Sequence, residues 1–194
     1  NDIESIRKAV DIIEKAKVPY ALLHTTNIYP TPQHLVRLGA IKEIMCSFPN
    51  AVVGLSDHTI TNHACFGAVA LGASILERHF TDRMEREGPD IICSMDGQAL
   101  RELIEGVNIL FDERGGKKGV VLEEQSTIDF AQATVVTIKK IKMGENFTKN
   151  NIWVKRPGIG EFKADMFEKI LGCKSSIDIP KNTHLKNRHV KCLN

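Results

Sequence analysis

Two short stretches decide the fold of this chain: AVVGLSDH at residues 51–58 and SILERHF at residues 74–80. Each reads as a buried strand that ends at a histidine, His58 or His79, and a short helical stretch separates the two. The carboxyl ends of parallel strands meet at one edge of a sheet, where active sites lie. We therefore expect the two imidazoles to bind one metal ion and to leave coordination positions open for substrate. The alternative is two unrelated histidines, one packed and one capping.

Helical and strand-like segments alternate on both sides of these stretches. Apolar residues recur with helical spacing between short buried runs, and this order indicates an α/β fold with a parallel sheet. The predicted helices cover residues 1–16 (with Asn1 and Glu4 spaced as a capping box), 31–45 (with Thr31 as the cap), 62–71 and 96–110 (opened by Asp96), and the predicted strands cover 18–26, 51–56 and 74–80.

Three strands cannot close a barrel, and strands that are buried on both faces need neighbours. A chain that opens on a helix reads as the C-terminal half of a (β/α)8 TIM barrel, so we expect a fragment of a longer protein. Its exposed strand edges predict that the isolated chain is inactive and poorly soluble.

Composition is that of an ordinary globular protein. The 194 residues are 42% hydrophobic and 26% charged, and no apolar run approaches the ~20 residues that span a bilayer. Nothing resembles a signal peptide, so no membrane association is expected. The five cysteines show no CxxC spacing and are expected to be reduced thiols of a cytoplasmic protein, at positions 46, 65, 93, 173 and 192.

Charge divides the chain unevenly. Residues 1–130 carry 13 basic and 19 acidic groups, whereas residues 131–194 carry 13 basic and 5 acidic groups. A glycine- and lysine-rich stretch at 114–119 lies before the change in sign. The predicted organisation is a partial barrel domain over 1–115, a linker over 116–130 and a small basic domain over 131–194.

The basic domain consists of short β-like pieces and contains a weak repeat. IKMGENFTKNNI at 141–152 aligns with IPKNTHLKNRHV at 179–190, with apolar residues matched at both ends and at the centre. Gly144 aligns with Asn182, and these two residue types best tolerate a positive φ. A β-rich domain folded on a pseudo-twofold axis is therefore expected.

Several motifs resemble those of the sialic acid (N-acetylneuraminate) synthases. They are HTTNIYPTP at 24–32, GLSDHT at 54–59, ILERHFTD at 75–82, GPD at 88–90 and WVKRPG at 153–158, in the order of that family. The resemblance implies the C-terminal part of a TIM barrel followed by an antifreeze-like (SAF) domain. The family's lysines and its catalytic glutamate belong to the amino-terminal half of the barrel, which this sequence does not contain.

The resemblance also implies a reaction. These enzymes condense phosphoenolpyruvate with an N-acetylhexosamine, typically N-acetylmannosamine, to a nine-carbon 2-keto sugar acid and phosphate. His58 and His79 would be the catalytic metal ligands, most often for Mn²⁺, with Mg²⁺ or Co²⁺ as alternatives. The metal would polarise the open-chain sugar aldehyde for attack by C3 of phosphoenolpyruvate.

The resemblance assigns five substrate-binding positions. Asn27 and Ser56 match residues that bind the phosphate of phosphoenolpyruvate, and Tyr29 and Asp90 match residues that hold the sugar. Arg156 matches an arginine that contacts the acetamido group of the sugar across a domain-swapped homodimer. Each also has an ordinary reading, as a turn residue, a cap, surface packing, a loop carboxylate or a solvated basic loop.

Three alternatives remain open. The acceptor could be a 2,4-diacetamido sugar of the legionaminic or pseudaminic type, or a 6-phosphate. The protein could be a different barrel aldolase or lyase that uses pyruvate. The chain could also be a non-catalytic basic binding module. Nucleic acid is not expected as a partner, because residues 131–194 hold only four aromatics and no stacking platform.

Overall fold

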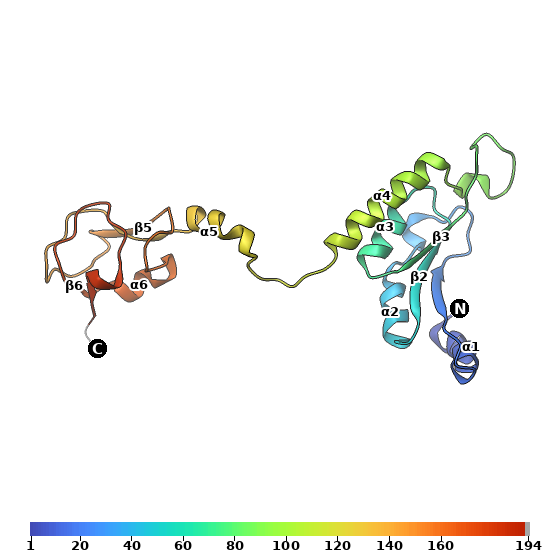
Figure 1. The fold of residues 1–194 in the computed structure, drawn as a ribbon, viewed down its shortest axis with the longest axis horizontal. Coiled ribbons are helices and arrows are strands. Elements are labelled where there is room, and N and C mark those ends of the chain that lie inside the picture. Colours follow the sequence, from blue (N-terminus) through green and yellow to red (C-terminus); the bar gives the residue numbers. More distant parts are fainter. Residues whose placement is uncertain (193–194) are drawn as a thin grey trace. The chain divides into compact units, whose positions relative to one another are not determined.

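The computed structural model describes residues 1–192, which form two compact units (Figure 1). The first unit runs from Asn1 to Lys117 and the second begins at Lys118. Each has its own apolar core, so the two are described separately. No helix in the described part of the chain is both long enough and apolar enough to cross a membrane.

The first unit is a parallel sheet with helices between its strands, as the sequence predicted. The strand order is β1-β2-β3, and both pairings are parallel. The sheet consists of β1 (Ala21–Thr25), β2 (Val52–Asp57) and β3 (Ile75–Arg78), and the helices are α1 (Ile3–Lys15), α2 (Gly39–Ser47), α3 (His63–Ala70) and α4 (Gly97–Glu113).

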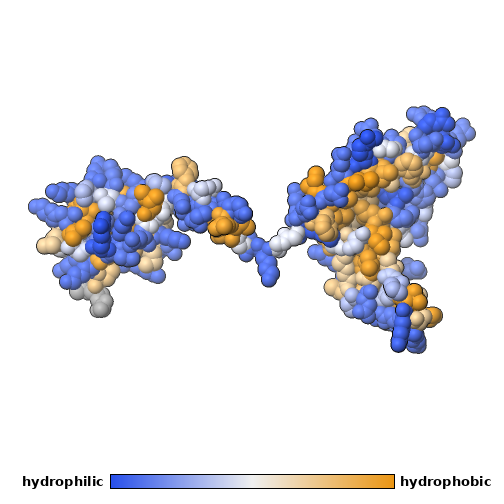
Figure 2. Space-filling model, in the orientation of Figure 1, coloured by the Kyte–Doolittle hydropathy of each residue, from blue (hydrophilic) through white to orange (hydrophobic). Residues whose placement is uncertain are grey.

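Strand alternation gives this sheet two different faces. One face carries Val53, Leu55 and Leu76, which pack into the core beneath α2 and α3. On the other face, Val52 is 47% exposed and Ile75 is 37% exposed. Figure 2 shows apolar atoms, in orange, at the surface of this unit. The second face, here called the open face, is not covered by the helices of the first unit.

Two predicted helix starts are wrong. The first helix is capped by Asp2, whose carboxylate accepts a hydrogen bond from the Ser5 amide at 2.8 Å, so Asn1 and Glu4 form no capping box. Thr31 does not start a helix either, because its hydroxyl donates to backbone carbonyls of the preceding loop.

The segment after Thr31 is also broken. A short 3₁₀ turn covers Gln33–Leu35, and α2 begins only at Gly39. Between them Arg37 has a φ of +52°, which interrupts helical geometry. By contrast, Asp96 caps α4 as predicted and accepts hydrogen bonds from two amides of its first turn.

The second unit is small and contains two short antiparallel strand pairs, β4-β5 and β6-β7. Its core includes Phe147, Ile152 and Ile170, all less than 3% exposed. Part of the segment predicted as a linker, 116–130, is helical. The elements are α5 (Gln125–Ala131), β4 (Thr134–Thr137), β5 (Ile152–Lys155), α6 (Phe167–Ile170), β6 (Lys174–Ser175) and β7 (Val190–Lys191).

The predicted repeat corresponds to a pseudo-twofold arrangement. Ile141 and Ile179 exchange two backbone hydrogen bonds of 2.9 and 2.8 Å, and both side chains are buried. Gly144 and Asn182 both have positive φ, +82° and +61°, and each donates its amide to an equivalent carbonyl of the other half. The matching turn at these positions is therefore confirmed.

The expectation that all five cysteines are reduced is wrong for one pair. Cys173 and Cys192 form a disulfide, with Cα atoms 4.5 Å apart. Lys174 pairs with Lys191 in the β6-β7 ladder, so the cysteines that flank these residues face each other as the next cross-strand pair. No sequence motif predicts this pairing. Cys46, Cys65 and Cys93 are free thiols.

The half-barrel and the antifreeze-like identity of the second unit remain predictions. What the described residues form is an open three-stranded sheet, with β1 and β3 at its edges, and a β-containing basic unit.

Candidate functional site

The candidate site lies at the carboxyl ends of the three parallel strands. His58 directly follows β2, and His79 directly follows β3. In the sheet, Thr25 pairs with Ser56 and Ser56 pairs with Glu77, which places a polar row on the open face. His58 and His79 each come two residues after a member of this row. Because side chains alternate along a strand, both histidines are on the side of the open face.

Three aromatic rings from different strand ends cluster at this edge. The ring centroids of His58 and His79 are 5.3 Å apart, with an interplanar angle of 65°. Tyr29 stacks on His58 at 4.0 Å and meets the ring of His79 edge-on at 5.7 Å. The structure therefore brings together two predicted metal ligands and one predicted sugar-binding residue.

The orientation of His58 is set by the backbone of a neighbouring strand end. Its Nδ1 lies 3.0 Å from the carbonyl oxygen of Thr26. A carbonyl oxygen only accepts, so Nδ1 carries a proton and Nε2 is the ring nitrogen that can bind a metal. A ring nitrogen fixed in this way is typical of histidines that ligate a metal through the other nitrogen. The backbone is also held, since the carbonyl of His58 accepts from the Thr31 amide at 2.9 Å.

His79 is held in a comparable way. Its carbonyl accepts a hydrogen bond from the Met95 amide at 2.9 Å, and its Nδ1 lies 3.6 Å from a carboxylate oxygen of Asp90. The Asp90 side chain is 51% exposed, so this contact is a weak, solvated one. Asp90 thus reaches the site from the loop that follows β3.

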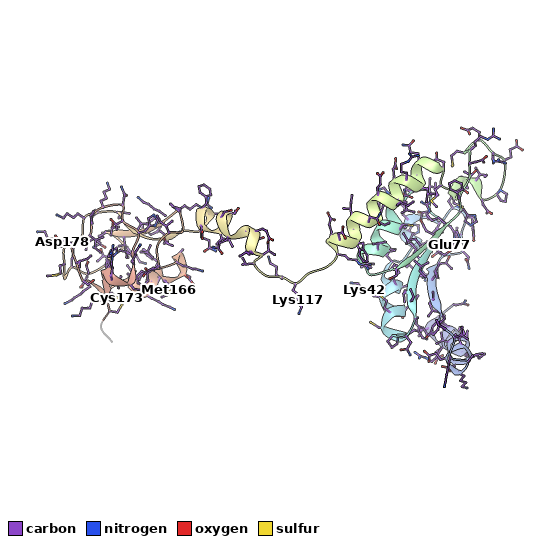
Figure 3. The ribbon with its side chains drawn as sticks, in the orientation of Figure 1. Lys42, Glu77, Lys117, Met166, Cys173 and Asp178 are labelled. Atoms are coloured by element: carbon purple, nitrogen blue, oxygen red, sulfur yellow. A yellow bond between two sulfur atoms is a disulfide. The ribbon has the colours of Figure 1, made fainter. Side chains whose placement is uncertain are left out.

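Glu77 is a site residue that the sequence analysis missed. Glu77, which is labelled in Figure 3, lies on β3. Its carboxylate accepts a hydrogen bond from the Ser56 hydroxyl. Its position two residues before His79 is a signal that could have identified it, because strand alternation places both on the open face.

The arrangement fits a divalent metal ion with few protein ligands. Two imidazole nitrogens suit Mn²⁺, Co²⁺ and related ions, and substrate oxygens and water complete such a shell. The described residues contain no cluster of three or more histidine, cysteine or carboxylate side chains that could hold a metal by themselves. The fully buried thiol of Cys65 contacts Asp57 on the covered face, and burial, with a smaller effect of Asp57, raises its pKa to about 12.

Asn27 and Arg156 are the remaining predicted substrate-binding residues. Asn27 follows β1 and is exposed. Arg156 belongs to the second unit, where it is exposed directly after β5. Its role toward a sugar stays a prediction.

Fold and candidate site together define an α/β protein with clustered polar side chains at the carboxyl edge of a parallel sheet. A profile of the NeuB family matches residues 1–119. The chain belongs to the NeuB family, which confirms its resemblance to the sialic acid synthases.

Several relatives of the chain are named as sugar-acid synthases. The chain is 38% identical over 152 residues to the N,N'-diacetyllegionaminic acid synthase of Campylobacter jejuni, covering 78% of the chain and 45% of that protein. It is 39% identical over 90 residues to the N-acetylneuraminate-9-phosphate synthase of Drosophila melanogaster, covering 46% of the chain and 24% of that protein.

A solved structure of a sugar-acid synthetase is also similar to this chain. The N-acetylneuraminic acid synthetase of Leptospira borgpetersenii is 30% identical, with a TM-score of 0.62, over 66% of this chain and 45% of that one. The chain spans about half the length of the curated relatives that it matches.

Proposed function

We propose that the protein to which this chain belongs condenses phosphoenolpyruvate with an N-acetylated hexosamine, giving a nine-carbon 2-keto sugar acid and phosphate. The observation that carries this proposal is the convergence of His58 and His79, 5.3 Å apart, at adjacent strand ends of a NeuB-family chain. A bound divalent ion, which we propose to be Mn²⁺, would polarise the aldehyde of the open-chain sugar.

The residues of this chain would hold the two reactants against each other. Ser56 and Asn27 would bind the phosphate, and Tyr29 and Asp90 would bind the sugar. Tyr29 already contacts both histidine rings, so a sugar that it holds would lie beside the metal ligands. Fixing both reactants in this way lowers the entropic part of the barrier.

The bond changes are balanced without a redox partner. C3 of phosphoenolpyruvate forms a carbon–carbon bond to the aldehyde carbon, whose oxygen becomes a hydroxyl. Water adds at C2, and phosphate leaves with cleavage of its C–O bond. The base that accepts the proton of this water would come from the amino-terminal half of the enzyme, as the family resemblance implies.

Arg156 would supply the remaining contact to the sugar. Its planar guanidinium can hold the carbonyl oxygen of an acetamido group without changing protonation state. We propose that this contact reaches the sugar held by a second copy of the chain in a domain-swapped homodimer.

The test is phosphate release by the full-length protein, supplied with phosphoenolpyruvate and Mn²⁺. The acceptors are N-acetylmannosamine, its 6-phosphate and a 2,4-diacetamido sugar, and an EDTA-treated sample serves as control. Release that depends on one sugar and disappears with EDTA is expected. No release with any sugar would overturn the proposed reaction and favour the basic binding module.

The panel is needed because the relatives differ in the product they are named for. The legionaminic acid synthase and the neuraminate-9-phosphate synthase are equally similar to this chain where they align, at 38% and 39% identity. We propose N-acetylmannosamine as the acceptor, and the diacetamido sugars as the alternative.

A further inference from the structure

A buried ion pair lies directly behind the two histidines. Asp57 and Arg78 immediately precede His58 and His79, and they are register partners in the β2-β3 pairing. Arg78 Nε lies 3.3 Å from Asp57 Oδ2, and the side chains are 1% and 2% exposed, respectively. By strand alternation, both point to the covered face, opposite to the histidines.

The guanidinium also fixes the loop that follows His58. Arg78 Nη2 donates to the carbonyl of Thr59 and Nη1 donates to Oδ1 of Asn62, each at 2.5 Å. Asp57 accepts from both the amide and the hydroxyl of Thr59, at 3.0 and 2.9 Å. The two charged side chains therefore hold both the strand ends and the first turn beyond β2.

Stability alone does not explain such a pair. Two charges lose their hydration when they are buried, and apolar side chains of similar volume stabilise a fold equally well or better. Here Arg78 Nε lies close to Asp57 but makes no hydrogen bond, so the contact is not optimised for strength. What a buried pair provides is register, because a slip of one residue would leave both charges unpaired and reverse the faces of the strand.

We propose that Asp57 and Arg78 are positioning residues for the metal ligands. By locking the register of β2 against β3 and the turn at Thr59, they hold His58 and His79 so that both imidazoles reach one divalent ion. This inference rests on the proposed function, in which the two histidines bind that ion.

The experiment uses the full-length protein and Mn²⁺ alone as the probe. In the main variant, Asp57→Leu is combined with Arg78→Met, which removes both charges and leaves no unpaired one. Ile41→Ala is the matched control, because Ile41 is a fully buried core residue on α2 and is not one of the hydrogen-bond partners of the ion pair. Thermal unfolding measures stability, EPR of free Mn²⁺ measures affinity, and ¹⁴N modulation of the bound ion counts imidazole ligands.

The double variant is expected to fold with a lowered unfolding temperature, because the buried backbone groups of Thr59 lose their partners, and to bind Mn²⁺ at least about 10-fold more weakly, as when outer-shell support of a metal is lost. It should also lose one imidazole from the ¹⁴N signal. The control should lower the unfolding temperature and leave affinity and ligand count unchanged. If the double variant does not fold, Arg78→Lys takes its place, because lysine keeps the charge but loses the planar guanidinium that donates to both Thr59 and Asn62. Its unfolding temperature, Mn²⁺ affinity and number of imidazole ligands are measured in the same way.

Wild-type affinity and two imidazole ligands in the folded variant would overturn the positioning role while leaving the proposed function intact. A wild-type protein that binds Mn²⁺ without histidine nitrogens would overturn both.

Discussion

The histidine rings at the site are oriented by neighbours on other segments of the chain. His58 donates to the Thr26 carbonyl and stacks on Tyr29, and His79 faces Asp90. These contacts leave the Nε2 atom of each ring available, which is the property that a shared metal site requires.

Replacing either histidine with alanine in the full-length protein is expected to abolish metal-dependent turnover without unfolding the protein. Each ring would supply one of the two proposed imidazole ligands, so one substitution would leave a single nitrogen. Phosphate release and circular dichroism are the measurements. His34→Ala is the control, since His34 is exposed on the Gln33–Leu35 turn. Near-normal turnover by His58→Ala or His79→Ala would remove the metal-site assignment.

Ser56→Ala should reduce kcat/KM for phosphoenolpyruvate by about 10- to 100-fold, the range expected when a hydrogen bond of ~1.5–3 kcal/mol to a charged group is lost. Steady-state kinetics at saturating sugar measures the effect. Ser74→Ala, an exposed serine just before β3, should leave the constant unchanged. Equal constants for Ser56→Ala and wild type would exclude Ser56 from phosphate binding.

The elements of the first unit were largely predictable, because hydrophobic periodicity identified the alternation of helices and strands. The exact ends of the helices were not predictable in the same way. Asp2, and not Asn1, is the N-cap of α1. The positive φ of Arg37 breaks the predicted helix, although its apolar pattern continues past this residue. The Cys173–Cys192 disulfide was not predictable because it depends on cross-strand register, which sequence spacing does not contain. Glu77 was identifiable from its spacing to His79, but its contact with Ser56 again depends on register.

At the level of the sheet, Gly54 allows β2 and β3 to approach closely. A methyl group on Gly54 would collide with the carbonyl oxygen of Ile75 on the neighbouring strand. Gly54→Ala is therefore expected to reduce the free energy of unfolding by roughly 1–3 kcal/mol, the usual cost of overpacking. Urea denaturation of the full-length protein measures it. Gly97→Ala, where nothing lies within 4 Å of an added methyl group, should be neutral or slightly stabilising. Equal stability of the two variants would contradict the described strand spacing.

In the second unit, two histidines make stability depend on pH. Burial, with the nearby cations Lys155 for His184 and Arg188 for His189, lowers the pKa of both imidazoles below their usual 6.5. The unfolded chain therefore binds more protons than the folded unit just below pH 6.5. The free energy of unfolding should fall as the pH drops below that value.

Trp153, the single tryptophan of the chain, lies in this unit, so urea denaturation followed by its fluorescence at pH 7.5 and 5.5 measures the effect. Replacing both histidines with glutamine should remove most of the difference. A unit equally stable at the two pH values would show that these imidazoles are not held neutral.

For the whole molecule, the two units differ in charge as well as in fold. The second unit, residues 118–194, carries an excess of six positive charges, and the first unit, residues 1–117, carries an excess of four negative ones. The proposed substrate phosphoenolpyruvate and the proposed sugar-acid product are both anions. A basic unit would raise their local concentration, and this attraction weakens as salt is added.

The most direct test of the central claim follows the bridging oxygen of phosphoenolpyruvate. The full-length protein is supplied with phosphoenolpyruvate labelled with ¹⁸O between C2 and phosphorus, together with Mn²⁺ and the acceptor sugar, and the products are analysed by mass spectrometry. The account predicts that label leaves entirely with the phosphate, and only when sugar and metal are both present. Label retained in pyruvate or in the sugar acid would mean that the P–O bond is cleaved, which would contradict the proposed condensation.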